Sequence, residues 1–489
     1  METLPLPSLE GSEADSVFLR NQLLNSDFTQ AAICRRLHLT RLAMIDAETV
    51  RARDSGPLGC ASDVLIRLFL EGWPVRREEV ERLLPPDVPA VLERLNLMVK
   101  HGADMYAATV TLYPIEDLYI ASDRYNNADG SPFEGADDMV DQCLFPTTER
   151  LITGVPRTAC DSVLDMCAGC GVGGLLCAAT AKRVLAVDVT ARSVHFVRFN
   201  AMLNGFTNVE ARRGNLYEPV EGETFDRITA HPPYQPVWRH LQTFNSGGFD
   251  GEQIAKAVLE DAPRHLKPGG RLYCLCQLSD REHAAEARVR SWLTPEARTC
   301  VDIAFVCFQH RNVIEYSAIS ALCENWPAAE WKEWVARLRP LHIRGMVYGM
   351  FVLQHAASAR KTFTVRREGP CAHAAEIEAL VNWETEAAHP LFADRVDRMH
   401  LRLRPECELL VRHKVDRVAW QPSGATLRNT KPFEASLQID SLTMGLLARL
   451  DGCKPLGEHL RAVSLKAPAE KVAALVCMLV SQGFAEVIR

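Results

Sequence analysis

The sequence contains no apolar run of the roughly 18 residues that a membrane-spanning helix requires. Its N-terminus lacks the basic segment followed by an apolar segment that marks a secretory signal peptide. The chain has 16 cysteines, and Cys167 and Cys170 form one CxxC pair. There is no second CxxC pair and no Cys/His cluster at zinc spacing. These absences predict a cytoplasmic protein with no membrane partner, no metal, and cysteines that are reduced and mostly buried.

The chain also lacks an excess of positive charge. Its 55 Lys and Arg residues stand against 62 Asp and Glu residues, a formal net charge of −7. A protein whose whole surface binds nucleic acid would be basic. We therefore favour a small molecule or peptide as the partner over RNA or DNA. With 489 residues, of which 47% are apolar, the chain is long enough for several domains with apolar cores.

One stretch organises the rest of the chain. An apolar segment at 162–166 predicts a buried strand, a turn crowded with glycine follows, and residues 175–180 are helical in pattern. A strand, a glycine turn and a helix start form a nucleotide-type cofactor site, because glycine lets the backbone approach a ligand and the helix start has free N–H donors. The alternative is a plain strand–helix turn whose glycines serve only packing.

Two kinds of cofactor fit these glycines. Gly169, Gly171 and Gly174 satisfy GxGxxG, and Asp188 closes the next apolar run, which is also the dinucleotide pattern. The carboxylate of Asp165 would oppose a pyrophosphate but suits the cationic amine and sulfonium of S-adenosylmethionine. The sequence therefore predicts S-adenosylmethionine, with Asp188 on its ribose hydroxyls, and leaves a nucleotide-cofactor oxidoreductase as a weaker alternative.

A second set of motifs lies around this stretch. The segment from about Leu144 to Gln354 resembles class I methyltransferases with an (Asn/Asp/Ser)-Pro-Pro-(Tyr/Phe) motif, and most of all the "methyltransferase small domain" group, which includes release-factor glutamine and ribosomal-RNA guanine N-methyltransferases. The matching motifs are Asp165-x-x-x-Gly169-x-Gly171-x-Gly173, Ala186-Val187-Asp188-Val189, Arg198-Phe199-Asn200-Ala201-x-x-Asn204-Gly205, Gly214-Asn215-Leu216-Tyr217-Glu218-Pro219, His231-Pro232-Pro233-Tyr234 and Gly247–Gly251.

The resemblance implies roles for particular residues. The loop after the first strand would hold the amino acid half of the cofactor, and Asn215 with Leu216 would flank the adenine. A segment before the core would lie over the cofactor, where Thr147 and Thr148 would either touch its methionine end or N-cap the next helix with Glu149 in its first turn. The implied cofactor-binding residues are Asp165, Ala168, Gly169, Gly171, Gly173, Asp188, Val189, Asn215, Leu216 and Thr148, and the implied catalytic residues are His231, Pro232 and Tyr234.

The chain departs from the family pattern at two positions. The family often has an acid at the position of Asn215, and usually Asn or Asp at the position of His231. In the family, the first side chain of the motif and a proline carbonyl accept the substrate N–H bonds, and the final aromatic stacks on the substrate. A neutral His231 has one acceptor nitrogen that can replace the amide oxygen, or it can act as a general base. Alternatively, it is a structural residue of a site that no longer transfers methyl.

The predicted fold is α/β: a seven-stranded Rossmann-like class I methyltransferase core flanked by N- and C-terminal, mainly helical winged-helix-like domains. We expect residues 1–15 to be disordered, 16–125 to form the N-terminal domain, 126–355 the cofactor-binding domain, and 356–489 a C-terminal α/β accessory domain. The predicted core strands lie near 162–166, 183–188, 208–212, 225–230, 270–277, 301–308 and 346–354, with crossover helices near 172–180, 190–204 and 252–266.

The flanking regions carry weaker patterns. Helical spacing runs from 15 to about 48, and further helices are predicted at 62–72 with Ser62 as N-cap, at 75–84 and at 87–95. Short strands at 97–99 and 107–113 precede a connection over 114–143. Residues 247–251 are predicted as a mobile lid or an ordinary loop, and residues 316–340, with three tryptophans, as a helix. Near the C-terminus, mixed charges on strands predict a solvated face, followed by helices at 441–450, 455–463 and 468–482 and a strand at 484–488.

These observations predict an S-adenosylmethionine-dependent methyltransferase that N-methylates a planar or amide-like nitrogen of a small molecule or peptide. An RNA or protein (glutamine-type) N-methyltransferase is the alternative within that class. A catalytically silent, S-adenosylmethionine-sensing regulatory protein is the alternative from another class.

Overall fold

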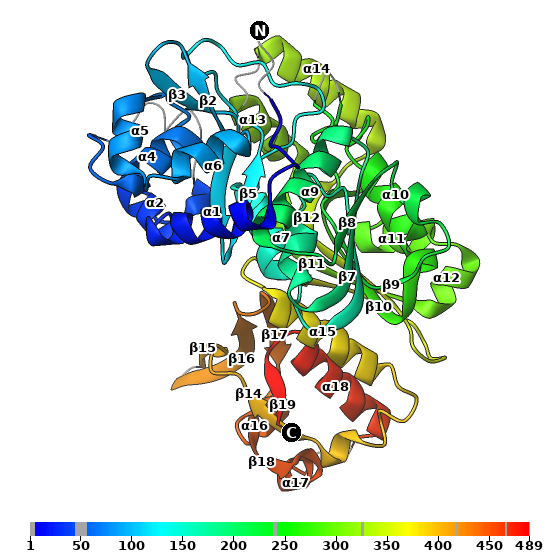
Figure 1. Ribbon diagram of the computed structural model, residues 1–489. Coiled ribbons are helices and arrows are strands. Elements are labelled where there is room, and N and C mark those ends of the chain that lie inside the picture. Colours follow the sequence, from blue (N-terminus) through cyan, green and yellow to red (C-terminus); the bar gives the residue numbers. More distant parts are fainter. Residues whose placement is uncertain are drawn as a thin grey trace. The chain divides into compact units, whose positions relative to one another are not determined.

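The computed structural model describes residues 5–44, 56–237, 242–323, 327–416, 419–464 and 467–488. Residues 45–48 of the first predicted helical stretch and Trp326 of the predicted tryptophan-rich helix lie outside these ranges. The chain divides into two units, Met1–His265 and Leu266–Arg489. Figure 1 labels their helices and strands and colours the chain by residue number. All the predicted cofactor and substrate residues belong to the first unit, so this unit is described in most detail.

The first unit begins with a mainly helical segment that ends in a small sheet and a hairpin. The small sheet is antiparallel, with strand order β1-β3-β2, and β4 pairs with β5 in the hairpin. The elements are α1 (Glu13–Asn25), α2 (Gln30–Leu37), a short 3₁₀ turn η1 (Leu42–Met44), α4 (Ala61–Ile66), a π-helical turn η2 (Arg67–Glu71), β1 (Val75–Arg76), α5 (Arg77–Leu83), α6 (Val88–Arg94), β2 (Met98–His101), β3 (Met105–Ala108), β4 (Thr111–Ile115) and β5 (Leu118–Ser122).

Capping interactions set the limits of the third helical segment. The carboxylate of Asp63 accepts a 3.1 Å hydrogen bond from the backbone N–H of Cys60. Cys60 is the N-cap, and α4 begins at the next residue, Ala61. The prediction of Ser62 as N-cap is therefore wrong, because its hydroxyl donates to the carbonyl of Asp27 at 3.1 Å. The predicted end at Gly72 is confirmed: this residue has a left-handed φ of 70°, which glycine adopts without strain.

Three local predictions differ from the structure. The helical stretch from residue 15 is interrupted, because Thr29 caps the start of α2 and separates it from α1. The strand predicted at 107–113 is divided between β3 and β4, which pair in different sheets. Within the predicted connection over 114–143, residues 118–122 form β5, whose partner is β4.

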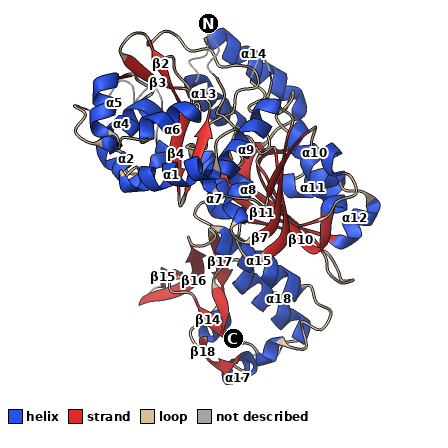
Figure 2. Cartoon of the chain, viewed as in Figure 1, coloured by secondary structure: helices blue, strands red, loops and turns tan. Residues whose placement is uncertain are grey.

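The rest of the first unit alternates strand and helix (Figure 2). Strands β6 and β7, β6 and β9, and β7 and β8 are parallel neighbours, which gives the order β9-β6-β7-β8. The elements are α7 (Pro146–Gly154), β6 (Cys160–Met166), α8 (Val172–Ala178), β7 (Ala181–Asp188), α9 (Ala191–Asn204), β8 (Val209–Arg213), a short turn η3 (Glu218–Val220), β9 (Phe225–Ala230), α10 (Gln253–Asp261) and η4 (Ala262–His265). The predicted strands and crossover helices of this segment are confirmed within a few residues.

The second unit starts with the remaining core strands. Strand β12 pairs antiparallel with both β10 and β11, and β13, which the sequence prediction missed, pairs parallel with β11. The strand order of the whole sheet is β13-β11-β12-β10-β9-β6-β7-β8, the seven predicted strands and β13. The elements are β10 (Leu266–Asp280), α11 (Ala285–Trp292), α12 (Pro295–Cys300), β11 (Val301–Arg311), α13 (Val313–Cys323), α14 (Ala328–Leu338), η5 (Arg339–Leu341), β12 (Gly345–His355) and β13 (Thr364–Glu368).

The C-terminal part of the second unit combines helices with two three-stranded antiparallel sheets, of order β18-β14-β19 and β15-β16-β17. The predicted helices near 441, 455 and 468 and the last strand are confirmed, whereas α15 was not predicted. The elements are α15 (Ala374–Ala387), η6 (Val396–Arg398), β14 (His400–Leu403), β15 (Glu408–Asp416), β16 (Ala419–Asn429), β17 (Ala435–Ile439), α16 (Ser441–Leu447), β18 (Asp451–Pro455), α17 (Leu456–Ala462), α18 (Ala469–Ser481) and β19 (Ala485–Ile488).

Candidate active site

The loops that follow β6, β7, β8 and β9 lie at one edge of the sheet, because these four strands are parallel. These loops carry most of the predicted site residues. Direct backbone contacts join neighbouring loops: the N–H of Gly214, after β8, donates to the carbonyl of Asp188, at the end of β7, at 3.0 Å. The loop order along the sheet therefore brings the predicted cofactor and substrate residues to one side of the first unit.

The glycine turn between β6 and α8 has one open position. Gly169 and Gly171 have left-handed φ values of 54° and 84°, and Gly171 is the N-cap of α8. A Cβ atom at Gly169 would meet no atom within 4 Å, whereas one at Gly171 would lie 3.0 Å from Val197. Gly169 is thus where a ligand can approach the backbone, and Gly171 is glycine for its conformation and for packing.

The other two glycines of the turn make room for a carboxylate. A Cβ atom on Gly173 would lie 2.6 Å from Oδ1 of Asp165, and one on Gly174 would lie 3.0 Å from the Cβ of the same residue. The backbone N–H of Gly174 donates a 2.8 Å hydrogen bond to Oδ2 of Asp165. The first turn of α8 therefore packs directly on this side chain, and the contact of Gly173 with the cofactor stays a prediction.

Asp165 is a buried acid at the end of β6, with 3% of its surface exposed. Burial raises its pKa to about 7, and the nearby charge of Asp188 raises the pKa as well. Hydrogen bonds from Thr229 and the N–H of Gly174 act in the opposite direction. A cation bound beside this carboxyl would favour its ionised form, as the predicted contact with the cofactor amine requires.

Asp188 holds the glycine turn and the start of α9 together. Its Oδ2 accepts a 3.0 Å hydrogen bond from the N–H of Gly169, and its Oδ1 accepts from the N–H and hydroxyl of Thr190 at 3.0 and 3.2 Å. Each carboxylate oxygen accepts more than one hydrogen bond, so Asp188 can still bind ribose hydroxyls. The next side chain, Val189, is 47% exposed and offers an apolar surface beside this acid.

The loop after β8 has a carboxylate close to Asn215. The amide of Asn215 donates to Oε1 of Glu218 at 3.5 Å, and its backbone N–H donates to Oε2 at 3.3 Å. Leu216, between them, is half-buried and has a left-handed φ of 49°. Glu218 thus places a carboxylate within reach of Asn215, a contact that sequence reasoning had missed.

His231 directly follows β9 and is the one buried polar group of the motif without a partner. Its Nε2 atom is shielded from solvent and has no hydrogen-bond partner in the described structure. Burial lowers the pKa of His231 to about 4, so the imidazole is neutral at physiological pH. The ring lies near that of Tyr234, with 5.9 Å between centroids and 33° between planes.

The segment Gly247–Gly251 lies against the residues that follow the motif. The N–H of Gly247 donates to the carbonyl of Gln235 at 2.9 Å, and the N–H of Val237 donates to the carbonyl of Gly248 at 2.8 Å. A Cβ atom on Gly247 would be 2.7 Å from the Cα of Tyr234, so this glycine permits the close approach. The segment predicted as a lid or loop is thus hydrogen-bonded to the backbone of the residues directly after the motif.

Thr148 lies inside helix α7, not at its cap. The helix begins at Pro146 with Phe145 as N-cap, so the alternative that Thr147 or Thr148 caps this helix is wrong. Glu149 is in the first turn, as predicted. Thr148 is 8% exposed, and its contact with the cofactor stays a prediction.

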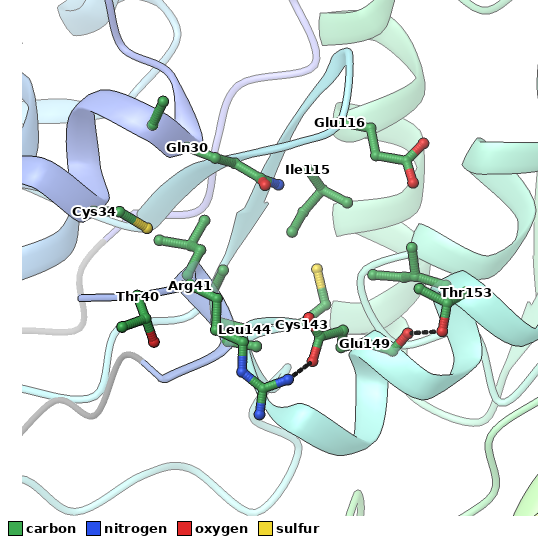
Figure 3. A pocket seen from close by; sticks show the side chains of 14 residues that line it. Gln30, Cys34, Thr40, Arg41, Ile115, Glu116, Cys143, Leu144, Glu149 and Thr153 are labelled. Atoms are coloured by element: carbon green, nitrogen blue, oxygen red, sulfur yellow. Dashed lines mark hydrogen bonds and ion pairs between the residues drawn. The ribbon is translucent and has the colours of Figure 1, made fainter. Parts of the chain in front are cut away.

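A cavity of about 500 Å³ lies beside α7 (Figure 3). Arg41 and Glu149, which form a 2.8 Å ion pair, line it together with apolar side chains such as Ile115 and Leu144. Its lining includes none of the predicted cofactor or substrate residues, so this cavity is distinct from the site at the strand ends.

Among the described residues, no three side chains of His, Cys, Asp and Glu are grouped in a way that would hold a metal ion. Within the same described ranges, no helix is both long enough and apolar enough to cross a membrane.

Comparison with known proteins identifies the class of this segment. Residues 139–289 match the family model of the methyltransferase small domain. This segment contains the glycine turn, both carboxylates and the His-Pro-Pro-Tyr motif. It is therefore a class I methyltransferase domain of the S-adenosylmethionine-dependent kind, and the resemblance noted in the sequence is confirmed.

Three of the similar proteins are named glutamine methyltransferases. A release factor glutamine methyltransferase of Xylella fastidiosa is 36% identical over 119 residues, which cover 21% of this chain and 43% of the relative. A putative protein N5-glutamine methyltransferase of Methanocaldococcus jannaschii is 33% identical, and the match covers 22% of this chain and 57% of the relative. A ribosomal protein uL3 glutamine methyltransferase of Bradyrhizobium diazoefficiens is 32% identical, and the match covers 24% of this chain and 41% of the relative. The chain thus spans about half the length of the curated relatives it matches.

Proposed function

We propose that this protein is a methyltransferase that uses S-adenosylmethionine to methylate the side-chain amide nitrogen of a glutamine in a protein. The names of its relatives support this substrate class over the small molecule that the charge balance favoured, because the matched relatives named above are all glutamine methyltransferases. Of the two sequence-based alternatives, the protein (glutamine-type) enzyme is therefore the better supported.

The state of His231 is the observation that carries the proposal. An amide nitrogen is a poor nucleophile, because its lone pair is delocalised into the carbonyl. Acceptors placed at its two N–H bonds orient the nitrogen and help to localise that pair. With its proton on Nδ1, a neutral His231 offers its unpartnered Nε2 as such an acceptor, and the carbonyl of Pro232 is the second. The side chain thus takes the place of the amide or carboxylate oxygen in related motifs.

The low pKa of His231 favours its role as an acceptor over its role as a base. A group with a pKa of about 4 binds a proton weakly at neutral pH. The imidazole is therefore not expected to retain the proton that the nitrogen loses on methylation. Tyr234, whose ring lies 5.9 Å from that of His231, provides the flat surface on which the planar amide stacks.

The residues at the strand ends fit the cofactor. When bound, S-adenosylmethionine supplies a methyl group on a positively charged sulfur. The open side of Gly169 accepts the close approach of its amino acid half, and Asp165 beside the turn compensates its positive amine. Asp188 binds the ribose, and exposed Val189 covers the adenine. Much of the remaining catalysis is then positioning.

The domain organisation is also part of the proposal. Residues 126–355 form the catalytic domain together with β13, which pairs with β11 of the same sheet, and residues 16–125 and the rest of 356–489 form accessory domains. A cytoplasmic location agrees with a substrate from the translation machinery, the class that two of the relatives' names indicate.

Labelled methyl transfer tests the proposal. The purified protein is incubated with methyl-labelled S-adenosylmethionine and, separately, with total protein, total RNA and a deproteinised extract of small molecules. We expect label in protein, and acid hydrolysis of that protein should release it as volatile methylamine, because hydrolysis cleaves an N-methyl amide.

The other outcomes distinguish the alternatives. Label in RNA or in small molecules would overturn the protein substrate but keep the enzyme class. No label in any fraction, despite tight binding of S-adenosylhomocysteine, would favour the silent sensor. Binding of NAD but not of S-adenosylhomocysteine would favour an oxidoreductase.

A further inference from the structure

Two asparagines of helix α9 bind the backbone edge of strand β5. Asn204 donates from Nδ2 to the carbonyl of Tyr119 at 2.7 Å and accepts from its N–H at 2.9 Å. Asn200 donates from Nδ2 to the carbonyl of Ala121 at 2.9 Å and accepts from its N–H at 2.8 Å. Each side chain thus pairs with β5 as a neighbouring strand would.

The spacing of the two side chains matches the strand. Four residues of a helix rise about 6 Å, and two residues of a strand span about 6.8 Å. Asn200 and Asn204 are therefore in register with Ala121 and Tyr119. Both amides are buried, with 0% and 7% of their surface exposed, so an unmade bond here would be costly.

Asn200 makes one contact that its counterpart lacks. Its second Nδ2 hydrogen is directed to the carbonyl of Cys170 at 2.9 Å. Cys170 lies in the glycine turn, between Gly169 and Gly171, both of which have left-handed φ values. One side chain therefore joins the β4–β5 hairpin, helix α9 and the turn at which the cofactor is proposed to bind.

We infer that Asn200 is a positioning residue for the cofactor: it holds the glycine turn in its binding conformation and makes that conformation depend on the position of the β4–β5 hairpin. The inference rests on the proposed function, because it concerns the same cofactor site. The N-terminal segment would thus influence the site without contributing a residue that touches the cofactor.

The packing around Asn200 supports this coupling. Phe196 and Phe199 of α9 are buried in the same apolar core as Phe28, which lies between α1 and α2, and Phe69 of η2. On the other side, the turn is closed by a 2.7 Å hydrogen bond from the N–H of Gly171 to the carbonyl of Ala168. A helix fixed in this core can thus transmit the position of β5 to the turn through one amide.

The test compares Asn200→Ala with Asn204→Ala in the full chain. Both variants lose two bonds to the edge of β5. Asn200→Ala also loses the bond to the turn, whereas Asn204→Ala loses the 2.8 Å bond from its Nδ2 to the backbone carbonyl of Asn200 within the helix. We expect Asn200→Ala to weaken binding of S-adenosylhomocysteine and to raise KM for S-adenosylmethionine by about threefold to tenfold, with little change in kcat. Amide hydrogen exchange of residues 168–172 should also become faster in the ligand-free variant.

For Asn204→Ala, affinity and exchange in the turn should stay at wild-type values, although its Tm falls. Equal changes in both variants, or wild-type exchange in the turn of a folded Asn200→Ala, would overturn the inference. If Asn200→Ala does not fold, Asn200→Ser, which removes the same amide, is measured with the same criteria. If the wild type does not bind S-adenosylhomocysteine, the proposed function fails, while exchange in the turn still tests the role of Asn200.

Discussion

The hydroxyl of Thr229 donates a 2.8 Å hydrogen bond to the carboxylate of Asp165 and so joins the end of β9 to the end of β6. Thr229 lies two residues before His231, and Asp165 lies beneath the glycine turn. The contact therefore links the part of the site proposed to hold the cofactor to the part proposed to hold the methyl acceptor.

The affinity for the cofactor should depend on pH through Asp165. The pKa of Asp165 is raised to about 7 in the ligand-free protein, and only the ionised form compensates a positive amine. Affinity for S-adenosylhomocysteine should fall as pH drops below 7, approaching about tenfold per pH unit, and binding near pH 6.5 should release a proton. Calorimetry in buffers of different ionisation enthalpy measures both effects.

Asp165→Asn is the control for this titration, since it should bind S-adenosylhomocysteine more weakly and lose the pH dependence.

The same residue affects the stability of the fold. The folded protein holds its proton up to about pH 7, whereas the ordinary pKa is 3.8. The folded state thus binds more protons than the unfolded state between these values, so this acid lowers the free energy of unfolding as pH rises through the window. A wild-type affinity that does not change between pH 6 and 8 would contradict the assigned role.

Gly173 should tolerate no side chain, because a Cβ atom there would be 2.6 Å from the carboxylate of Asp165. We expect Gly173→Ala to lower the free energy of unfolding by about 1–3 kcal/mol and to weaken binding of S-adenosylhomocysteine. The matched control is Gly222→Ala. Gly222 has a φ of 79° with open space around it, so that variant should lose about 1–2 kcal/mol and keep its affinity. Urea unfolding and calorimetry distinguish the two, and equal affinities would show that Asp165 does not matter for binding.

Asp188 should contribute to binding through geometry as well as charge. Its Oδ2 orients the N–H of Gly169, the open position of the turn. Asp188→Ala should therefore weaken the binding of S-adenosylhomocysteine more than the binding of adenine or methionine tested alone. The reason is that the variant loses both the ribose contact and the hydrogen bond that orients the turn. Competition binding with these fragments provides the measurement, and a uniform loss across the three ligands would argue for a general structural defect.

The rate should be insensitive to the titration of His231 near neutrality. At saturating cofactor, kcat should show no inflection between pH 5.5 and 8 from this residue, because burial has lowered its pKa to about 4. An imidazole acting as a general base with an ordinary pKa would give an inflection near 6.5. A His231→Asn variant measured over the same range should give the same flat profile at its own rate, which separates other titrating groups from this one.

Much of the fold follows from local sequence patterns. The apolar runs that became β6, β7 and β9, and the glycine turn between β6 and α8, need only their own residues to be recognised. Strand β5 could not be found in this way, because it is stabilised by β4 and by amides from α9 that lie about 80 residues away in sequence. Non-local pairing of this kind leaves no periodic signal in the strand itself.

The site was only partly predictable for the same reason. Asp165, Asp188 and His231 stand at strand ends, which sequence order alone brings to one edge. The contacts that shift their pKa values do not share that pattern: Thr229, near the end of the neighbouring strand β9, donates to Asp165, and the burial of His231 depends on the surrounding fold. Gly173 matched a cofactor motif, yet its nearest neighbour is the carboxylate of Asp165.

One comparison of variants tests the central claim most directly. Wild type, His231→Ala and His231→Asn are compared for transfer of labelled methyl to protein at saturating cofactor, with S-adenosylhomocysteine affinity measured in parallel. We predict that kcat of His231→Ala falls by a factor of about 10²–10³, with unchanged affinity for S-adenosylhomocysteine. His231→Asn, which restores an acceptor, should recover a large part of the rate. Equal transfer by wild type and His231→Ala would contradict the account.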